Sequence, residues 1–310
     1  MKILVTGANG FIGKALCKKL RNQQHDVIAA VRRRCNISNV TILENEYSWE
    51  KALMNQDIVI HTAGLSQVRK DTEIDPLEVY RSVNVQKTRI LAQQAAASGV
   101  KLFIFLSSIK VNGELTKTNS YFSFRDEASP KEPYSISKWE AEQTLREIAA
   151  KTNLKIVIIR SPLVYGPGVK GNFLSLLNLL DRGIPLPFGG IKNKRSLVGL
   201  NNLIDLIITC TERPAAANKT FLVSDDDDLS TTELLQRLAC ALNKPVKLLP
   251  FPTSILQLGA SLLGRRDTAQ RLLGNLQLDI SHTKKALDWS PPEGIETCLK
   301  ETASWYLSKK

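Results

Sequence analysis

The sequence predicts an α/β fold built on a doubly wound parallel sheet. Through the first half of the chain, short apolar runs rich in β-branched residues alternate with longer amphipathic stretches. Strands of a parallel sheet are apolar throughout because helices cover both faces of the sheet, and right-handed crossovers join them. The expected strands are residues 3–6, 26–31, 40–43, 57–62, 101–107 and 155–160, and the expected helices are 12–23, 76–98 and 134–152.

The pattern changes after Ser161. Loops rich in proline and glycine, at 162–171 and 183–190, separate short helices and isolated strands. Ser230 and Glu233 have the spacing of a capping box before an apolar helix. The sequence therefore predicts two units, residues 1–165 and a smaller, mostly helical unit at 166–310, with segments free to interleave. The ligand cleft is expected between them, at the carboxyl ends of the strands.

One apolar stretch in the second unit has two interpretations. Residues 251–263 are predicted to form a helix that packs over this unit, and a helix facing a membrane is the alternative. No apolar run of the chain approaches the ~18 residues needed to span a bilayer.

Charge and cysteine content narrow the class of ligand and the compartment. The formal charge is +12, from 42 Lys and Arg against 30 Asp and Glu. A basic surface attracts polyanions, and we favour phosphate-bearing small molecules over nucleic acid because no nucleic-acid module is recognisable. Loose attachment to an anionic membrane stays open. Five widely spaced cysteines without C-x-x-C, and no signal peptide before the first strand, predict a cytoplasmic protein with reduced thiols.

A glycine-rich turn follows the first expected strand and opens the first expected helix. Its spacing is G-x-x-G-x-x-G. Glycines allow a tight turn in which backbone amides approach a pyrophosphate at the positive end of the helix. We therefore predict a Rossmann-type domain that binds a dinucleotide through Gly7, Asn9, Gly10, Phe11, Ile12 and Gly13.

The residues after the second expected strand bear on which dinucleotide binds. An NAD site usually has an acidic side chain there, whereas arginine suits a ribose 2′-phosphate. This chain has Arg32 and Arg33 and no acid. The sequence therefore favours NADP(H), with NAD(H) as the alternative.

Tyr134 and Lys138 form a Y-x-x-x-K motif at the start of an expected helix, where both share one face. A lysine ammonium lowers the pKa of a nearby tyrosine, so that the phenol exchanges a proton with a substrate hydroxyl or carbonyl. Ser108 ends an expected strand and can hydrogen-bond the same oxygen. His61 is predicted to be a packing residue, and no metal site is expected because metal-ligand spacing is absent.

With these motifs the sequence resembles the extended short-chain dehydrogenase/reductase family, and within it the nucleotide-sugar epimerases and reductases. The shared stretches are TGANGFIG at 6–13, DIVIHTAG at 57–64, Asn84-Val85, and RSPLVYGPG at 160–168. The resemblance implies a catalytic triad and a homodimer through helices 76–98 and 134–152. The triad is Ser108, Tyr134 and Lys138, and the further cofactor residues are Ala63, Gly64, Asn84 and Ser107. One departure is Asn112, where relatives commonly have tyrosine.

The resemblance also implies a UDP-sugar substrate. By this analogy Asn172 and Arg195 hold the diphosphate, and Arg271 is a second phosphate-binding arginine. Phe188 belongs to a short apolar segment placed on the uracil. Guanidinium groups suit phosphate oxygens because they donate two parallel hydrogen bonds.

The residues after Ser108 restrict the reaction. Related dehydratases carry an Asp-Glu pair there, and this chain has Ile109 and Lys110. Epimerase-reductases that form deoxyhexoses add a Cys/His pair, and no cysteine lies near Ser108. What remains is hydride transfer at one carbinol carbon. We expect a 4-ketoreductase of a UDP-4-keto-6-deoxy-N-acetylhexosamine in surface-polysaccharide synthesis. The alternatives are a UDP-sugar 4-epimerase with retained NAD and a non-enzymatic dinucleotide-binding sensor or scaffold.

Overall fold

The architecture is that of a computed structural model, which describes residues 1–31, 40–42, 48–67, 75–262, 264 and 266–310. Seven strands in these ranges form one parallel sheet in the order β3-β2-β1-β4-β5-β6-β9, so the predicted doubly wound sheet is confirmed. The chain moves outward from β1 to β3 and then returns to β4 beside β1, which leaves a crevice at this switch point. The strands are β1 (Lys2–Thr6), β2 (Asp26–Val31), β3 (Val40–Ile42), β4 (Ile58–His61), β5 (Leu102–Ser108), β6 (Lys155–Ser161) and β9 (Lys219–Leu222).

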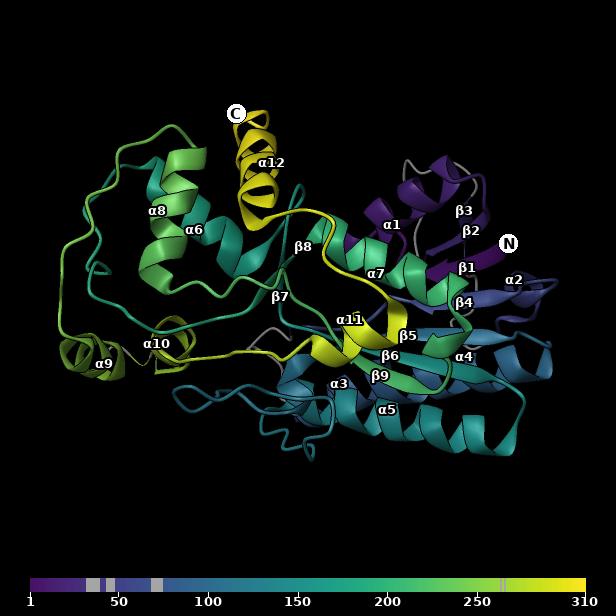
Figure 1. The fold of residues 1–310 in the computed structure, drawn as a ribbon. Helices are drawn as coiled ribbons and strands as arrows, with labels where there is room; N and C mark the ends of the chain where they lie inside the picture. Colours follow the sequence, from purple (N-terminus) through teal and green to yellow (C-terminus); the bar gives the residue numbers. More distant parts are fainter. Residues whose placement is uncertain (32–39, 43–47, 68–74, 263, 265) are drawn as a thin grey trace.

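Helices cover both faces of the sheet (Figure 1). α1 (Phe11–Asn22) and α7 (Leu200–Glu212) pack on one face, and α4 (Lys87–Ala97) and α5 (Pro133–Lys151) on the other. Neighbouring residues of β1 point to opposite sides, so Ile3 joins the core under α1 while Leu4 joins the core under α5. Both faces are apolar for this reason, as the sequence indicated.

The helix expected at 76–98 has a different internal geometry. It consists of α3 (Pro76–Tyr80), a π-helical segment (Arg81–Gln86) and α4. The Asp75 carboxylate caps its start by accepting a hydrogen bond from the Leu77 amide at 3.0 Å. A π-turn inserts an extra residue and often marks a functional site. A short helix, α2 (Glu50–Leu53), was not predicted.

The second half of the chain adds a small two-stranded sheet and its own core. β7 (Leu163–Tyr165) pairs in parallel with β8 (Leu197–Gly199). α6 (Gly171–Asp181), α8 (Thr231–Ala241) and α12 (Ile295–Leu307) enclose a cluster that includes Tyr165 and Phe173. The capping box at α8 is confirmed, because the Glu233 amide donates to the Ser230 hydroxyl and the Ser230 amide to the Glu233 carboxylate. α11 (Ser281–Leu287) lies beside β9, which extends the main sheet past β6.

One helix contradicts its prediction. α9 (Thr253–Leu262) has no buried residue, and its main neighbour is α10 (Arg266–Leu273). Figure 1 shows both helices at the outer end of the second region, away from the main sheet. The expectation that this apolar stretch packs over the substrate region is therefore wrong. No helix within the described ranges is both long and apolar enough to cross a membrane.

The contact between α1 and the glycine turn generates a stability prediction. A Cβ added at Gly13 would lie 2.3 Å from the Gly7 carbonyl oxygen, so Gly13→Ala should lower the free energy of unfolding by ~1–3 kcal/mol. Gly259, inside α9, has nothing within 4 Å of such a Cβ, so Gly259→Ala is the control and should raise it by up to ~1 kcal/mol. Urea unfolding measures both, and equal effects would contradict the close approach.

Candidate active site

The glycine turn lies at the carboxyl end of β1. Gly7 takes a positive φ of 67°, and the Gly10 amide donates to its carbonyl oxygen at 2.8 Å. Gly10 also occupies the cap position of α1, where no side chain caps the helix, and the first turn of α1 has no acidic residue. The amides and the positive end of the helix dipole are therefore available to an anion.

A cavity of about 300 Å³ opens beside this turn, in the crevice between β1 and β4. A Cβ at Gly7 would lie 2.7 Å from the Ala63 amide nitrogen, so only glycine allows the turn to approach β4 so closely. An uncapped helix end next to an apolar slot fits a dinucleotide, with its pyrophosphate on the amides. The lining residues include Gly7, Asn9, Gly10, Ala30, Val31, Trp49, Thr62, Ala63 and Gly64. Arg32 and Arg33, on which the NADP prediction depends, lie outside the described residues.

Ser108 and Tyr134 meet where β5 ends and α5 begins. Glu132 and Ser135 form a capping box that fixes the first turn of α5, and Pro133 occupies its first position. The Tyr134 phenol is hydrogen-bonded to the Ser108 hydroxyl, and its ring packs edge-on against Tyr80 at 5.9 Å between centroids. Burial raises the pKa of Tyr134 to about 12, and the hydrogen bond with Ser108 opposes this rise. Tyr134 is therefore a neutral proton donor at pH 7 in this structure.

Lys138 lies one turn further along α5. Its ammonium donates to the Leu106 carbonyl oxygen at 2.9 Å and lies 4.5 Å from the centroid of the Phe105 ring. Burial lowers the pKa of Lys138 to about 8, while the Glu142 carboxylate raises it. A Cβ at Gly64 would lie 3.2 Å from the Lys138 Nζ, so the lysine reaches the cofactor crevice.

Asn84 comes from the π-helical segment and connects the loop after β4 to α5. Its side-chain amide donates to the Leu65 carbonyl oxygen and to the Ser137 hydroxyl, each at 3.0 Å. Its Oδ1 accepts from the Leu65 amide at 2.8 Å. The asparagine therefore holds the crevice wall against the helix that carries Tyr134 and Lys138.

A buried ionic network lies beneath this site, and sequence reasoning missed it. The Arg160 guanidinium donates to both oxygens of the Glu142 carboxylate, with Nη2 at 2.6 Å from Oε2, and both side chains are buried. Ser107 donates to the same carboxylate at 2.5 Å, and Arg160 also donates to the Asn112 Oδ1 at 2.8 Å. Two signals were available: an acid four residues after Lys138, and a charged residue at the end of an apolar strand.

Asn112, the departure from the family pattern, thus has a structural partner. Its Nδ2 donates to the Ser123 carbonyl oxygen at 2.9 Å while its Oδ1 accepts from Arg160. The asparagine therefore fixes the loop after β5 to the buried network.

The structure brings the two predicted phosphate-binding arginines close together. Arg195 is half-buried, and its guanidinium donates to the Gly274 carbonyl oxygen at 2.9 Å. Burial lowers the pKa of Arg195 to about 10, and the nearby charge of Arg271 adds to this effect. Arg271 pairs with Glu132 at 3.2 Å, at the start of the helix that carries Tyr134. Two neighbouring guanidinium groups beside the active site suit a diphosphate.

The other two predicted substrate residues lie apart from this pair. Asn172 is exposed in the first turn of α6, and Phe188 packs, partly buried, against the core of the second region. Within the described part of the chain no hydrogen bond joins either side chain to Arg195 or Arg271. Their substrate roles stay predictions.

His61 is a packing residue, as expected. Its ring nitrogens are hydrogen-bonded to the Thr6 hydroxyl at 2.6 Å and the Thr88 hydroxyl at 2.9 Å, and the ring is buried. Burial lowers the pKa of His61 to about 3, and the charge of Lys138 contributes.

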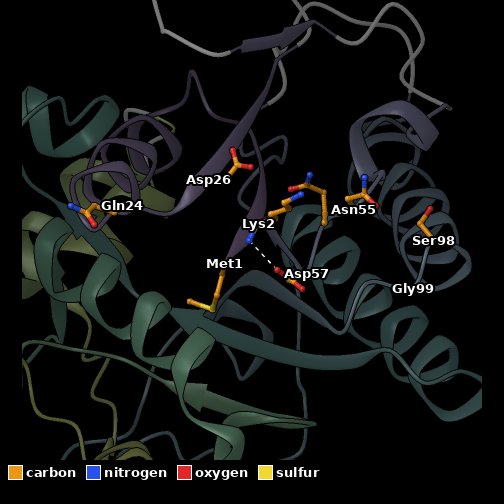
Figure 2. Close-up of a pocket in the computed structure, with 9 residues that line it drawn as sticks. Met1, Lys2, Gln24, Asp26, Asn55, Asp57, Ser98 and Gly99 are labelled. Carbon is orange, nitrogen blue, oxygen red and sulfur yellow. Dashed lines mark hydrogen bonds between the residues drawn. The ribbon is translucent and has the colours of Figure 1, made fainter.

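A second hollow opens at the opposite, amino edge of the sheet (Figure 2). The Asp57 carboxylate there accepts from the Lys2 amide at 3.0 Å and from the Lys101 ammonium at 3.0 Å. These hydrogen bonds lower the pKa of Asp57, the Lys2 bond most. The acid is thus engaged within the fold, and ligands of doubly wound sheets bind at the carboxyl edge instead.

A parallel sheet with a dinucleotide crevice at its switch point and a Ser-Tyr-Lys cluster at its carboxyl edge defines a short-chain dehydrogenase/reductase. The chain belongs to the NAD dependent epimerase/dehydratase family, whose model matches residues 3–224. The family prediction and the prediction that the protein is an enzyme of this kind are therefore confirmed.

Two relatives extend the comparison. A protein from Vibrio cholerae named UDP-glucose 4-epimerase is 46% identical over 312 residues, which cover 98% of this chain and 95% of the relative. The second relative is the N-acetyl-alpha-D-glucosaminyl-diphospho-ditrans,octacis-undecaprenol 4-epimerase of Escherichia coli O157:H7. It is 30% identical over 270 residues, which cover 82% of this chain and 77% of the relative.

Solved structures share the fold over the whole chain. The UDP-glucuronic acid 4-epimerase from Bacillus cereus in complex with NAD superposes with a TM-score of 0.80 at 19% identity, covering 100% of this chain and 99% of its own. The UDP-glucose 4-epimerase of Thermotoga maritima with UDP-glucose gives 0.78 at 22% identity, with coverage of 100% and 99%.

The burial of His61 predicts a pH-dependent stability. Because the pKa of His61 is lower in the folded chain than in the unfolded one, the unfolded state binds the extra proton as the pH falls below ~6.5. His61 should therefore cost the fold ~1.4 kcal/mol per pH unit below that value. Urea unfolding of the wild type and of His61→Gln at ~pH 7 and ~pH 5 should show a loss ~2 kcal/mol larger in the wild type. Parallel losses in the two proteins would contradict the buried neutral ring.

Proposed function

We propose that this chain is a UDP-sugar 4-epimerase that works with a retained NAD. The observation that carries the proposal is the single hydroxyl cluster of Ser108 and Tyr134 beside the dinucleotide crevice. Lys110 follows Ser108 by two residues, and its ammonium forms ion pairs with Glu114 at 2.9 Å and Glu132 at 2.5 Å. This cluster suits hydride transfer at one carbinol carbon, which a 4-epimerase and a 4-ketoreductase share. The 46% identity to the Vibrio cholerae protein named UDP-glucose 4-epimerase favours the epimerase.

In this proposal Ser108, Tyr134 and Lys138 have different roles in moving the proton. The bound dinucleotide supplies an acceptor that takes the hydride from carbon 4 and returns it. Tyr134, as phenolate, takes the proton from the hydroxyl on carbon 4 and later gives it back. The centre is inverted, without net oxidation, because the keto sugar turns its other face to the hydride donor before the hydride returns. Ser108 donates a hydrogen bond to the reacting oxygen. The Lys138 ammonium favours the phenolate, which opposes the raised pKa of Tyr134.

Substrate recognition in this proposal falls to the second region. Arg195 and Arg271 hold the diphosphate, and Asn172 and Phe188 complete the nucleotide site as the family resemblance implies. The half-buried Arg195 donates to a carbonyl oxygen and feels the charge of Arg271, so an anion between the two guanidinium groups would relieve their repulsion. UDP-glucose is bound in two of the similar solved structures and UDP-glucuronic acid in another.

The 4-ketoreductase expected from the sequence is the second candidate. A UDP-2-acetamido-2,6-beta-L-arabino-hexul-4-ose reductase from Pseudomonas aeruginosa is 22% identical over 243 residues. A reductase consumes a dissociable cofactor, and Arg32 and Arg33 would then favour NADPH. The homodimer through α4 and α5 and the cytoplasmic location stay predictions.

The nature of the cofactor separates the two candidates. An epimerase should release stoichiometric NAD from the purified, heat-denatured protein, and should interconvert UDP-glucose and UDP-galactose, or their N-acetyl forms, without added nucleotide. Chromatography of the released nucleotide and of the sugar products measures both. An empty protein that oxidises NADPH only when a 4-keto sugar nucleotide is added would establish the reductase instead.

The role of Tyr134 is tested by a substitution that removes its phenolic hydroxyl. Tyr134→Phe should lower kcat at least ~100-fold, because the proton exchange is lost, and leave UDP binding and retained nucleotide unchanged. Tyr121→Phe is the matched control, since Tyr121 is exposed, and should keep wild-type turnover. Near-normal turnover of Tyr134→Phe would refute the assignment.

A further inference from the structure

Large apolar side chains are exposed together at the outer end of the second region. Five of the twelve exposed large hydrophobic residues in the described part of the chain come from 249–262. They are Leu249, Phe251, Ile255, Leu258 and Leu262, which we call the α9 patch. An exposed apolar cluster of this kind marks an interaction surface.

The α9 patch is built on one face of a helix. Ile255, Leu258 and Leu262 have the spacing of one helix face and are 55%, 63% and 80% exposed. Leu249 and Phe251 precede the helix in the segment that leads to it. The opposite side of α9 turns to α10, so the exposed face has no partner within the described residues.

Two sequence stretches beside the α9 patch carry no acid, although acids of neighbouring segments pair with three of their basic residues, Lys194, Arg237 and Lys244. Residues 182–204 and 234–266 contain no Asp or Glu. The two stretches lie side by side, since the Leu186 amide donates to the Lys247 carbonyl oxygen at 2.9 Å and the Leu249 amide donates to the Leu186 carbonyl oxygen at 2.8 Å. Lys192 and Lys247 are exposed, and neither forms an ion pair with a described residue. The basic residues of the two stretches are Arg182, Lys192, Lys194, Arg195, Arg237, Lys244, Lys247, Arg265 and Arg266.

We propose that the α9 patch docks on the surface of an anionic phospholipid bilayer. An amphipathic helix with leucine, isoleucine and phenylalanine on one side and lysines around it lies in the plane of a membrane interface, where apolar burial and headgroup charge add. A second copy docked through the same patch would bring Lys192 and Lys247 of both copies together, and the like charges repel. The positive charges beside the α9 patch therefore favour an anionic membrane over a second copy of the chain. The proposal concerns where the enzyme works and does not depend on which sugar it converts.

The test is co-sedimentation of the full chain with vesicles. Wild-type protein should bind vesicles of phosphatidylcholine mixed with phosphatidylglycerol in equal amounts, bind pure phosphatidylcholine weakly, and be released by salt. Replacement of the three helix residues together, Ile255→Ser, Leu258→Ser and Leu262→Ser, should weaken binding to the anionic vesicles at least ~10-fold. Lys192→Gln with Lys247→Gln should weaken it as well and should reduce its dependence on salt.

The control replaces exposed apolar residues elsewhere, Met54→Ser with Leu307→Ser, and should bind as the wild type does. Turnover of a soluble UDP-sugar, measured on every variant, reports whether each is folded, so a failure of docking is separate from a failure of the proposed activity. No binding of wild-type protein to anionic vesicles, or unchanged binding by the triple variant, overturns the proposal. Concentration-dependent association that the triple variant abolishes, seen by sedimentation without lipid, would assign the patch to a second copy instead.

Discussion

The buried ion pair between Glu142 and Arg160 is the interaction on which the geometry of the active site depends. Glu142 belongs to α5 and Arg160 to β6, and Ser107, near the end of β5, donates to the same carboxylate. Charges without solvent are costly unless their hydrogen bonds are complete, so the pair tolerates few alternative arrangements. The helix that carries Tyr134 and Lys138 and the strand that ends at Ser108 are thereby held in one relative position.

The same ion pair influences the charge of the site. Glu142 lies one helical turn beyond Lys138, and its carboxylate raises the pKa of Lys138 against the larger effect of burial. Burial outweighs the effect of the carboxylate and leaves the pKa of Lys138 at about 8. The lysine is thus protonated at neutral pH but only weakly solvated. Its ammonium is directed by the Leu106 carbonyl oxygen and the Phe105 ring, two fixed groups of β5.

Local patterns predicted most of the fold and the centre of the site. Each expected strand exists, because strands covered on both faces leave a continuous apolar signal. The positions of Ser108, Tyr134 and the glycine turn were predictable because each lies at a strand end or a helix start, while their roles stay predictions. β9 was not predicted as part of the main sheet, because its place beside β6 depends on a pairing with residues far away in the sequence.

Three other features also escaped prediction. The π-helical segment that carries Asn84 leaves the apolar pattern of a helix unchanged, so no local signal marks it. The partners of Glu142 come from two strands far apart in the sequence, Ser107 from β5 and Arg160 from β6. α9 has an apolar composition typical of a packed helix, and only the tertiary structure shows that nothing in the described chain covers it.

Ion pairs link α10 of the second region to α5, and two different cations hold the same carboxylate at the start of α5. Glu132 caps α5 two residues before Tyr134 and is held by Arg271 from α10 and by Lys110 from the loop after β5. In the proposed complex a diphosphate takes Arg271 from the Glu132 Oε1, and Lys110 stays because it holds the other oxygen, Oε2. The cap of α5, and with it the position of Tyr134, would therefore keep one of its cations in the proposed complex. Arg271 is thus able to leave Glu132 in the proposed complex, because Lys110 also holds the carboxylate at the start of α5.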